Sequence, residues 1–213
     1  MHPLEETFRI LRVRVEAQAA SPAVLVVSAA KRHDGTTYVA CGLARAFAEA
    51  GKRTLLVDAN TPNPGVAREL ATAQPRPGRR LVELVAHDEI PRLTVSSLIR
   101  PADEGPLGEA SLQSVLDEMR AAYAVTVIDA APLPHSSIAL QLAHAANGLL
   151  LAVRLGRKTD RADDEVKRLL GKTAPLLGIV PTQARPTRGG RVLPFTPALG
   201  DDAKRESIGG RRR

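Results

Sequence analysis

Short runs of apolar residues alternate, along most of the chain, with segments whose apolar positions recur every three or four residues. The continuous apolar runs predict strands over residues 23–29, 53–59, 92–99, 124–130, 148–155 and 176–182. The segments between them predict helices over 36–50, 81–86, 111–123, 137–146 and 160–171. Apolar strands that alternate with helices are typical of a parallel sheet covered on both faces. The pattern therefore predicts an α/β fold, a doubly wound and mostly parallel sheet with helices on both faces.

A further amphipathic helix is expected ahead of the first strand, over residues 4–19. Its apolar positions recur at helical spacing and share one face: Leu4, Phe8, Leu11 and Val15. Three charged positions lie three apart on the opposite side: Glu6, Arg9 and Arg12. We therefore divide the chain into an N-terminal amphipathic helix (1–20), a central α/β domain (21–183) and a tail (184–213).

The tail is basic and rich in Arg, Gly and Pro, and we expect it to be disordered. It holds eight Lys or Arg against three Asp or Glu, so five of the seven net positive charges of the chain lie there. A solvated, flexible tail is the favoured interpretation, with contact to anionic lipid or an acidic partner as the alternative. A second irregular segment is expected at 75–80, where Pro, Gly and Arg cluster.

Composition narrows the class of protein. Aromatic residues make up 2% of the chain, with three Phe, two Tyr and no Trp, so Leu, Val, Ile and Ala must build the core. Few aromatic side chains are present to stack bases, which argues against nucleic acid as a partner. A single cysteine, Cys41, excludes an intramolecular disulfide. The charged N-terminus does not read as a signal peptide, and no apolar run approaches a membrane span, so we expect a cytoplasmic protein.

The stretch that follows the first strand resembles a phosphate-binding loop. Such loops follow the pattern G-x-x-x-x-G-K-[ST], in which backbone N–H groups and a lysine hold phosphates and the hydroxyl holds Mg²⁺. When this pattern is laid on residues 30–37, Gly35 and Thr37 are in register, but Ala30 and Thr36 replace the first glycine and the lysine. The motif fails as a pattern, whereas its context of strand, loop, helix, strand and aspartate is complete.

Two aspartates end predicted parallel strands. Asp58 ends the strand at 53–59 and Asp129 ends the strand at 124–130. Open α/β sheets bind ligands at the carboxyl ends of their strands, so these carboxylates are candidate catalytic and metal-binding groups, together with Thr37. Two structural alternatives stay open: each aspartate could cap the turn or helix that follows, and Thr37 could be an ordinary helix residue.

The whole arrangement resembles the bacterial tyrosine kinases of capsule and exopolysaccharide synthesis (BY-kinases), within the wider MinD/ParA group of P-loop ATPases. Four stretches carry the resemblance, over roughly residues 4–183: "EETFRILR", "GLARAFAEAGKRTLLVDAN", "YAVTVIDAAP", and "NGLLLAVRLGRKT" through "LLGIVPT". The first matches the E-x-x-R-x-x-R helix that packs subunits into a ring in that family. The second and third place Asp58 in the Walker A′ position and Asp129 in the Walker B position.

The resemblance implies a P-loop NTPase-like domain that binds ATP or ADP with Mg²⁺. By position, the nucleotide would contact Lys31, Gly35, Thr36, Thr37 and Thr182, and the metal would contact Thr37, Asp58 and Asp129. Glu6, Arg9 and Arg12 would carry oligomerisation. The implied partners are further copies of the chain or an active paralogue, and a membrane protein of the polysaccharide co-polymerase type, which would place the domain at the inner face of the cell membrane.

The departures from the family fall on its chemistry. Thr36 replaces the phosphate-binding lysine, Asn60 replaces the second aspartate of the A′ motif, and the tail from residue 184 contains no tyrosine. Lys31 does match the first lysine of the MinD/ParA loop, but Arg32 and His33 stand where that loop has glycines. Three hypotheses follow: a regulatory or scaffolding pseudo-kinase, which we favour, an active tyrosine autokinase, or a MinD/ParA-like ATPase that uses Lys31.

Overall fold

The computed structural model describes residues 3–60, 63–72, 82–86, 90–98, 109–170, 175–182 and 196–197. In chain order its elements are α1 (Pro3–Glu16), β1 (Ala23–Ala29), α2 (Thr36–Glu49), β2 (Thr54–Ala59), α3 (Val66–Glu69), β3 (Val82–Ala86), β4 (Leu93–Leu98), α4 (Glu109–Ala122), β5 (Val125–Ala130), a 3-10 turn η1 (Leu133–His135), α5 (Ser137–Ala145), β6 (Gly148–Arg154), α6 (Arg161–Leu170), β7 (Leu176–Thr182) and β8 (Thr196–Pro197).

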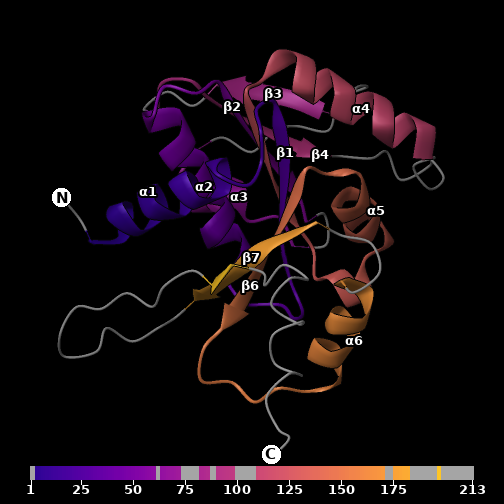
Figure 1. Ribbon diagram of the computed structural model, residues 1–213. Coiled ribbons are helices and arrows are strands. Elements are labelled where there is room, and N and C mark those ends of the chain that lie inside the picture. Colours follow the sequence, from indigo (N-terminus) through magenta and orange to yellow (C-terminus); the bar gives the residue numbers. More distant parts are fainter. Residues whose placement is uncertain are drawn as a thin grey trace, which may run out of the picture.

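One sheet organises the fold, with strand order β3-β4-β2-β5-β1-β6-β7-β8. The six strands from β4 to β7 pair in parallel, and only the outermost strands β3 and β8 pair antiparallel with their neighbours. Helices α1, α2 and α3 cover one face, and α4, α5 and α6 cover the other (Figure 1). The predicted α/β class, with a mostly parallel sheet and helices on both faces, is confirmed.

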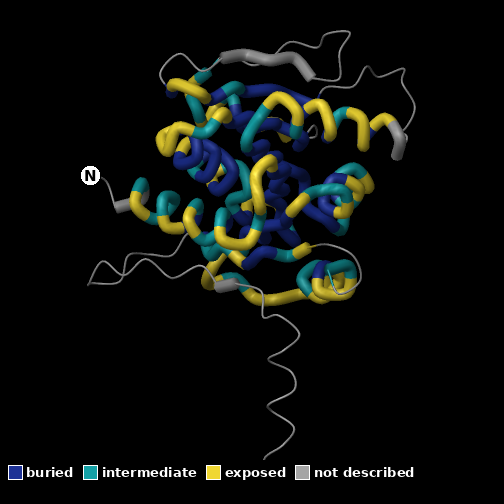
Figure 2. Tube along the Cα trace, turned by 45° about the horizontal axis from the view of Figure 1, so that its top comes forward, coloured by how far each residue is buried: buried dark blue, intermediate teal, exposed yellow. Residues whose placement is uncertain are grey.

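The central strands are buried on both faces, which explains their uninterrupted apolar sequences. Along β1, Leu25 and Val27 point into the core under α2, while Val24 and Val26 point into the core under α4 and α5. All seven residues of β1 are buried. Figure 2 shows the buried centre of the molecule and the exposed outer surfaces of the helices. Aliphatic side chains fill both layers, with Phe47 as the one fully buried aromatic ring in the described part of the chain.

Helix α1 packs on α2 through its apolar face. Leu11 and Val15 are buried there, and the ring of Phe8 lies directly over Gly42 of α2. A Cβ atom added at Gly42 would lie 2.3 Å from that ring, so the absence of a side chain is what lets the two helices approach. The helix predicted at 4–19 therefore exists, although it ends at Glu16, three residues before the predicted end.

One predicted element has the wrong type. Residues 81–86 read as a short helix, but Val82–Ala86 form strand β3, which pairs antiparallel with β4 from Val82↔Leu98 to Ala86↔Thr94. A segment this short has little helical stability of its own. Pairing also satisfies the backbone groups of β4, which would otherwise form an open sheet edge.

The remaining differences are small. Short elements α3 and η1 were not predicted, and Thr196–Pro197, within the tail expected to be irregular, pair with Gly178–Ile179 of β7. The segment 75–80 and the rest of the tail lie outside the described residues. Across the described ranges, no helix combines the length and apolar character needed to cross a bilayer.

We predict that the effect of Gly42→Ala on stability changes sign with the residue at position 8. In the unmodified chain the added methyl group displaces the Phe8 ring and lowers the free energy of unfolding by about 1 kcal/mol. In a Phe8→Ala background the clash is gone, and the better helix propensity of alanine raises it by up to about 1 kcal/mol. Urea unfolding of the four proteins measures this, and the same sign in both backgrounds would contradict the packing described.

Candidate functional site

The candidate site lies where the parallel strands end. Asp129 of β5 stands beside Val27 of β1 on one side and beside Asp58 of β2 on the other. Because all three strands run in the same direction, the segments that follow them leave the sheet at one edge. The loop after β1, both predicted aspartates and the segment between β6 and α6 therefore meet there.

The loop between β1 and α2 keeps the backbone shape of a glycine-rich loop. His33 has φ 65° and Gly35 has φ 92°, both in the left-handed region. Gly35 is held close to Thr182, since a Cβ atom at position 35 would lie 3.0 Å from that side chain. Helix α2 starts directly after it, with no side-chain cap and no acidic residue in its first turn. Free N–H groups at such a helix end are suited to an anion.

Asp129 and Thr37 are in direct contact. The Thr37 hydroxyl donates to Oδ2 of Asp129 over 2.6 Å. The carboxylate is fully buried, and its Oδ1 has no hydrogen-bond partner. Burial raises the pKa of Asp129 to about 7, and the nearby charge of Asp58 adds to this, while the Thr37 hydroxyl acts against it. A threonine hydroxyl beside an unpartnered carboxylate oxygen is a donor set that suits Mg²⁺.

Asp58 has a different environment, because its carboxylate is engaged by backbone groups. Oδ2 accepts from the N–H of Gly65 at 2.8 Å and of Val66 at 3.1 Å, and Oδ1 accepts from the N–H of Asn60 at 3.1 Å. Burial raises the pKa of Asp58, and these three donors oppose the shift. The side chain thus holds the start of α3, as in the capping alternative, while it stays beside Asp129.

Asp34 lies inside the loop and is almost completely buried. Its carboxylate forms a two-point contact with Arg157, in which Nε lies 3.0 Å from Oδ1 and Nη2 lies 2.9 Å from Oδ2. The Asp34 carbonyl accepts from the Thr182 hydroxyl at 2.7 Å. Thr182, expected at the nucleotide, therefore has its hydroxyl committed to the loop backbone.

Lys31 also contacts its own chain. Its amine forms ion pairs with Asp160, which immediately precedes α6, and, at 3.8 Å, with Asp163 in the first turn of α6. Asp163 is shared, because Arg157 donates to both of its oxygens, at 2.7 and 2.5 Å. Arg32 and His33 stand where the MinD/ParA loop has glycines. Both are exposed, as expected for solvated loop residues.

The proposed oligomerisation residues lie on α1, away from this edge. Arg9 forms ion pairs with Glu6 and with Glu49 of α2, each at 3.6 Å. Arg12 donates to Glu16 at 2.5 Å. Next to them Ile10 and Val13 are 48% and 54% exposed, which is unusual for large apolar side chains. Helix α1 thus presents a mixed apolar and charged outer face.

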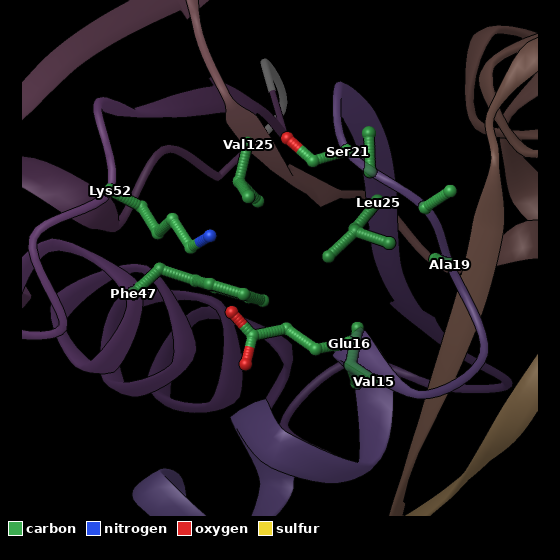
Figure 3. Close-up of a pocket in the computed structure, with 10 residues that line it drawn as sticks. Val15, Glu16, Ala19, Ser21, Leu25, Phe47, Lys52 and Val125 are labelled. Atoms are coloured by element: carbon green, nitrogen blue, oxygen red, sulfur yellow. The ribbon is translucent and has the colours of Figure 1, made fainter.

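A cavity of about 200 Å³ lies beside the amino end of β1 and is separate from the loop. Val15, Leu25, Phe47 and Val125 contribute its apolar walls, and Lys52 and Glu16 extend toward one another near Phe47 (Figure 3). Because the phosphate-loop position follows the opposite end of β1, this cavity belongs to another part of the molecule.

The structure thus brings the predicted residues into two groups. Thr36, Thr37, Asp58 and Asp129 meet at the strand ends, and Lys31, Gly35 and Thr182 belong to the adjoining loop. Sequence reasoning missed the residues that hold this loop: Arg157, Asp160 and Asp163. These residues form a charged stretch directly after a buried strand. Because ligands bind at the carboxyl ends of the strands in α/β sheets, this stretch could have been assigned to the same edge from the sequence.

Sequence comparisons with known proteins show which families the chain is similar to. No protein-family model matches the chain. Over 187 residues it is 22% identical to the tyrosine-protein kinase CpsD of Streptococcus agalactiae serotype III (strain NEM316), an alignment that covers 83% of this chain and 81% of CpsD. Over 173 residues it is 28% identical to the succinoglycan biosynthesis transport protein ExoP of Rhizobium meliloti (strain 1021), covering 73% of this chain and 22% of ExoP.

The chain is thus similar in sequence to bacterial tyrosine kinases of the BY-kinase type. Solved structures agree at the level of the fold. The kinase domain of the Escherichia coli tyrosine kinase ETK matches with a TM-score of 0.68 and 17% identity, over 88% of this chain and 80% of that one. The MinD cell division protein of Aquifex aeolicus matches with a TM-score of 0.61 and 18% identity, over 76% of this chain and 70% of that one. The P-loop NTPase-like fold that the resemblance implies is thereby confirmed.

We predict that Asp129→Asn stabilises the BY-kinase-like domain at pH 8 and that this gain shrinks toward pH 5. The folded carboxyl has a pKa of about 7, whereas that of an unfolded aspartate is near 4. Between pH 5 and pH 7 Asp129 is therefore protonated in the folded state and ionised in the unfolded state. The free energy of unfolding of the unmodified domain falls as the pH rises through this range. The gain should shrink by about 2–3 kcal/mol between pH 8 and pH 5.

Urea unfolding in buffer with EDTA measures this difference. Asp164→Asn is the matched control, because Asp164 is an exposed carboxylate that pairs only with Lys167 by its side chain, and its effect should stay within about 0.5 kcal/mol at both pH values. An equal gain from Asp129→Asn at pH 5 and pH 8 would contradict the burial argument.

Proposed function

We propose that this domain is a regulatory or scaffolding pseudo-kinase of bacterial capsule or exopolysaccharide synthesis. It would assemble through α1 with copies of itself or with an active paralogue, and act with a membrane protein of the polysaccharide co-polymerase type. The relationship to CpsD and ExoP supports the setting. The eroded phosphate loop supports the loss of catalysis.

One observation carries the proposal: two cations beside the loop, Lys31 and Arg157, are neutralised within the chain. Thr36 stands at the lysine position, Lys31 is paired with Asp160 and Asp163, and Arg157 is paired with Asp34 and Asp163. Phosphoryl transfer is catalysed largely by positioning and by charge neutralisation through a lysine and Mg²⁺. Removal of one such electrostatic contact costs on the order of 10²–10³ in rate.

The intact assembly helix supports the scaffolding role. The E-x-x-R-x-x-R pattern of Glu6, Arg9 and Arg12 is complete, and the exposed Ile10 and Val13 beside it offer apolar area for a subunit contact. Charges at an interface fix register and partner choice, while the apolar area supplies affinity. A chain that keeps this surface and has lost its loop lysine fits a subunit that assembles without transferring phosphate.

The second candidate is an active ATP-dependent tyrosine autokinase. The contact between Thr37 and Asp129, with Asp58 beside it, favours it, because these residues are placed to hold Mg²⁺ together with nucleotide phosphates. Within the described ranges no group of three His, Cys, Asp or Glu could hold a metal without such phosphates. A MinD/ParA-like ATPase would in addition require Lys31 to leave its partners on α6.

Calorimetric titration with MgADP and MgATP separates the two. We expect no binding by the unmodified domain at millimolar nucleotide, and a weak gain in Thr36→Lys, because the loop keeps its shape and lacks the charge. Binding by the unmodified domain that is lost in Lys31→Ala would overturn the pseudo-kinase and favour an ATPase or kinase.

We predict that Arg9→Ala lowers the self-association constant at least tenfold and changes the free energy of unfolding by less than about 1 kcal/mol, because its ion pairs lie at the surface. Sedimentation velocity over a concentration series measures the assembly. Arg168→Ala, an exposed arginine on α6, is the matched control and should assemble like the unmodified domain. Equal assembly of both variants, or a domain that is monomeric throughout, would contradict the role of α1.

A further inference from the structure

A continuous chain of charges joins the phosphate-loop position to α6. In order, the side chains are Lys31, Asp160, Asp163, Arg157 and Asp34. Two of them belong to the loop after β1, and three belong to the segment after β6, more than 120 residues further along the chain. We call these five residues the latch.

The latch is more strongly coupled than a typical surface ion pair. Asp34, Asp163 and Arg157 have side chains that are 2%, 12% and 16% exposed, and both carboxylates contact the guanidinium at two points. Charge-assisted contacts of this type are shorter and stronger than single neutral hydrogen bonds. Arg157 also lowers the pKa of Asp163 to about 2, so this shared carboxylate stays ionised through the physiological pH range.

The charges of the latch do not favour a phosphate. Three carboxylates face two cations, which leaves a net charge of −1 beside a loop whose shape suits an anion. Lys31, the one loop residue that matches a phosphate-binding lysine of the MinD/ParA group, is directed onto α6. A polyphosphate would have to displace Asp160 and Asp163 from this amine and approach Asp34.

We propose that the latch is an autoinhibitory contact, which keeps nucleotide polyphosphate out of the loop by holding Lys31 and Arg157 on the chain's own carboxylates. This inference rests on the proposed function, since it explains why the scaffold's loop does not take nucleotide. It adds that the loss of the lysine at position 36 is only part of the cause. Restoring that lysine alone leaves the latch closed.

The variants can open the latch without removing backbone contacts. Asp160 Oδ1 accepts from the Ala162 N–H, and Asp163 Oδ2 accepts from the Asp160 N–H. Asparagine keeps an oxygen acceptor at each position and is a good N-cap residue, so Asp160→Asn with Asp163→Asn mainly removes charge. Arg157 retains Asp34 as its partner. The matched control is Asp164→Asn with Glu165→Gln, two exposed acids of the same helix.

The first test is calorimetry with MgADP in the Thr36→Lys background. We expect D160N/D163N to tighten binding roughly tenfold or more, in the range expected for releasing a partly buried ion pair, and D164N/E165Q to leave it within about twofold. Equal binding by the two double variants would overturn the latch. If D160N/D163N does not fold, D160N alone should give a smaller gain in the same direction, and no gain there would overturn the proposal as well.

The second test measures whether Lys31 is held in the latch, in the chain without Thr36→Lys. Acetylation by an amine-reactive ester, followed by mass spectrometry, reports the accessibility of each lysine. Lys31 should react severalfold faster in D160N/D163N than in D164N/E165Q, while Lys52, which lines the cavity at the opposite end of β1, should serve as an internal reference. An unchanged Lys31 rate would contradict the contact.

Failure of the latch and failure of the proposed function give different results. Loss of assembly in Arg9→Ala would support the scaffold even if the latch fails, because Arg9 pairs with Glu49 at the end of α2 opposite the loop. Conversely, MgADP binding by the unmodified domain would overturn the pseudo-kinase, and the ratio between the two double variants would still decide on the latch.

Discussion

Parallel pairing of β1, β2 and β5 is the constraint on which the site depends. The register places Asp129 between Val27 and Asp58 and sends the following loops out at one edge. Apolar residues on both faces of these strands maintain the register, since a shift by one residue would exchange the two buried faces. The positions of Thr37, Asp58 and Asp129 therefore follow from core packing, and they persist whether or not nucleotide is bound.

Under the proposed function, the domain keeps its fold without its chemistry because the two depend on different residues. The residues that differ from the family pattern, Thr36 and Asn60, follow the strands, Thr36 as the first residue of α2 and Asn60 directly after β2, and neither belongs to the two apolar cores. The loop after β1 contains the buried Asp34, whose charge is neutralised by Arg157. The charge of Asp34 is thus satisfied within the chain.

The elements that could be predicted were those whose own sequence decides them. Strand β1, helix α2 and strand β7 follow from local patterns, and so does the placement of Asp58 and Asp129 at strand ends. Strand β3 was misread as a helix because its partner β4 determines its conformation, and six residues carry too little periodicity to show it. The ion pairs of Lys31 and Asp34 join residues that are more than 120 positions apart, so only the folded chain brings them together.

Hydrogen–deuterium exchange of the loop amides is the most direct test of the central claim, that this loop no longer holds phosphate. The exchange rates of the backbone N–H groups of residues 31–38 would be compared with and without millimolar MgADP in the unmodified domain. The account predicts the same rates in both conditions, because Thr36 stands at the lysine position and the latch holds Lys31 and Arg157 on carboxylates. Slower exchange in this segment on addition of MgADP would contradict it and restore the domain to the nucleotide-binding enzymes.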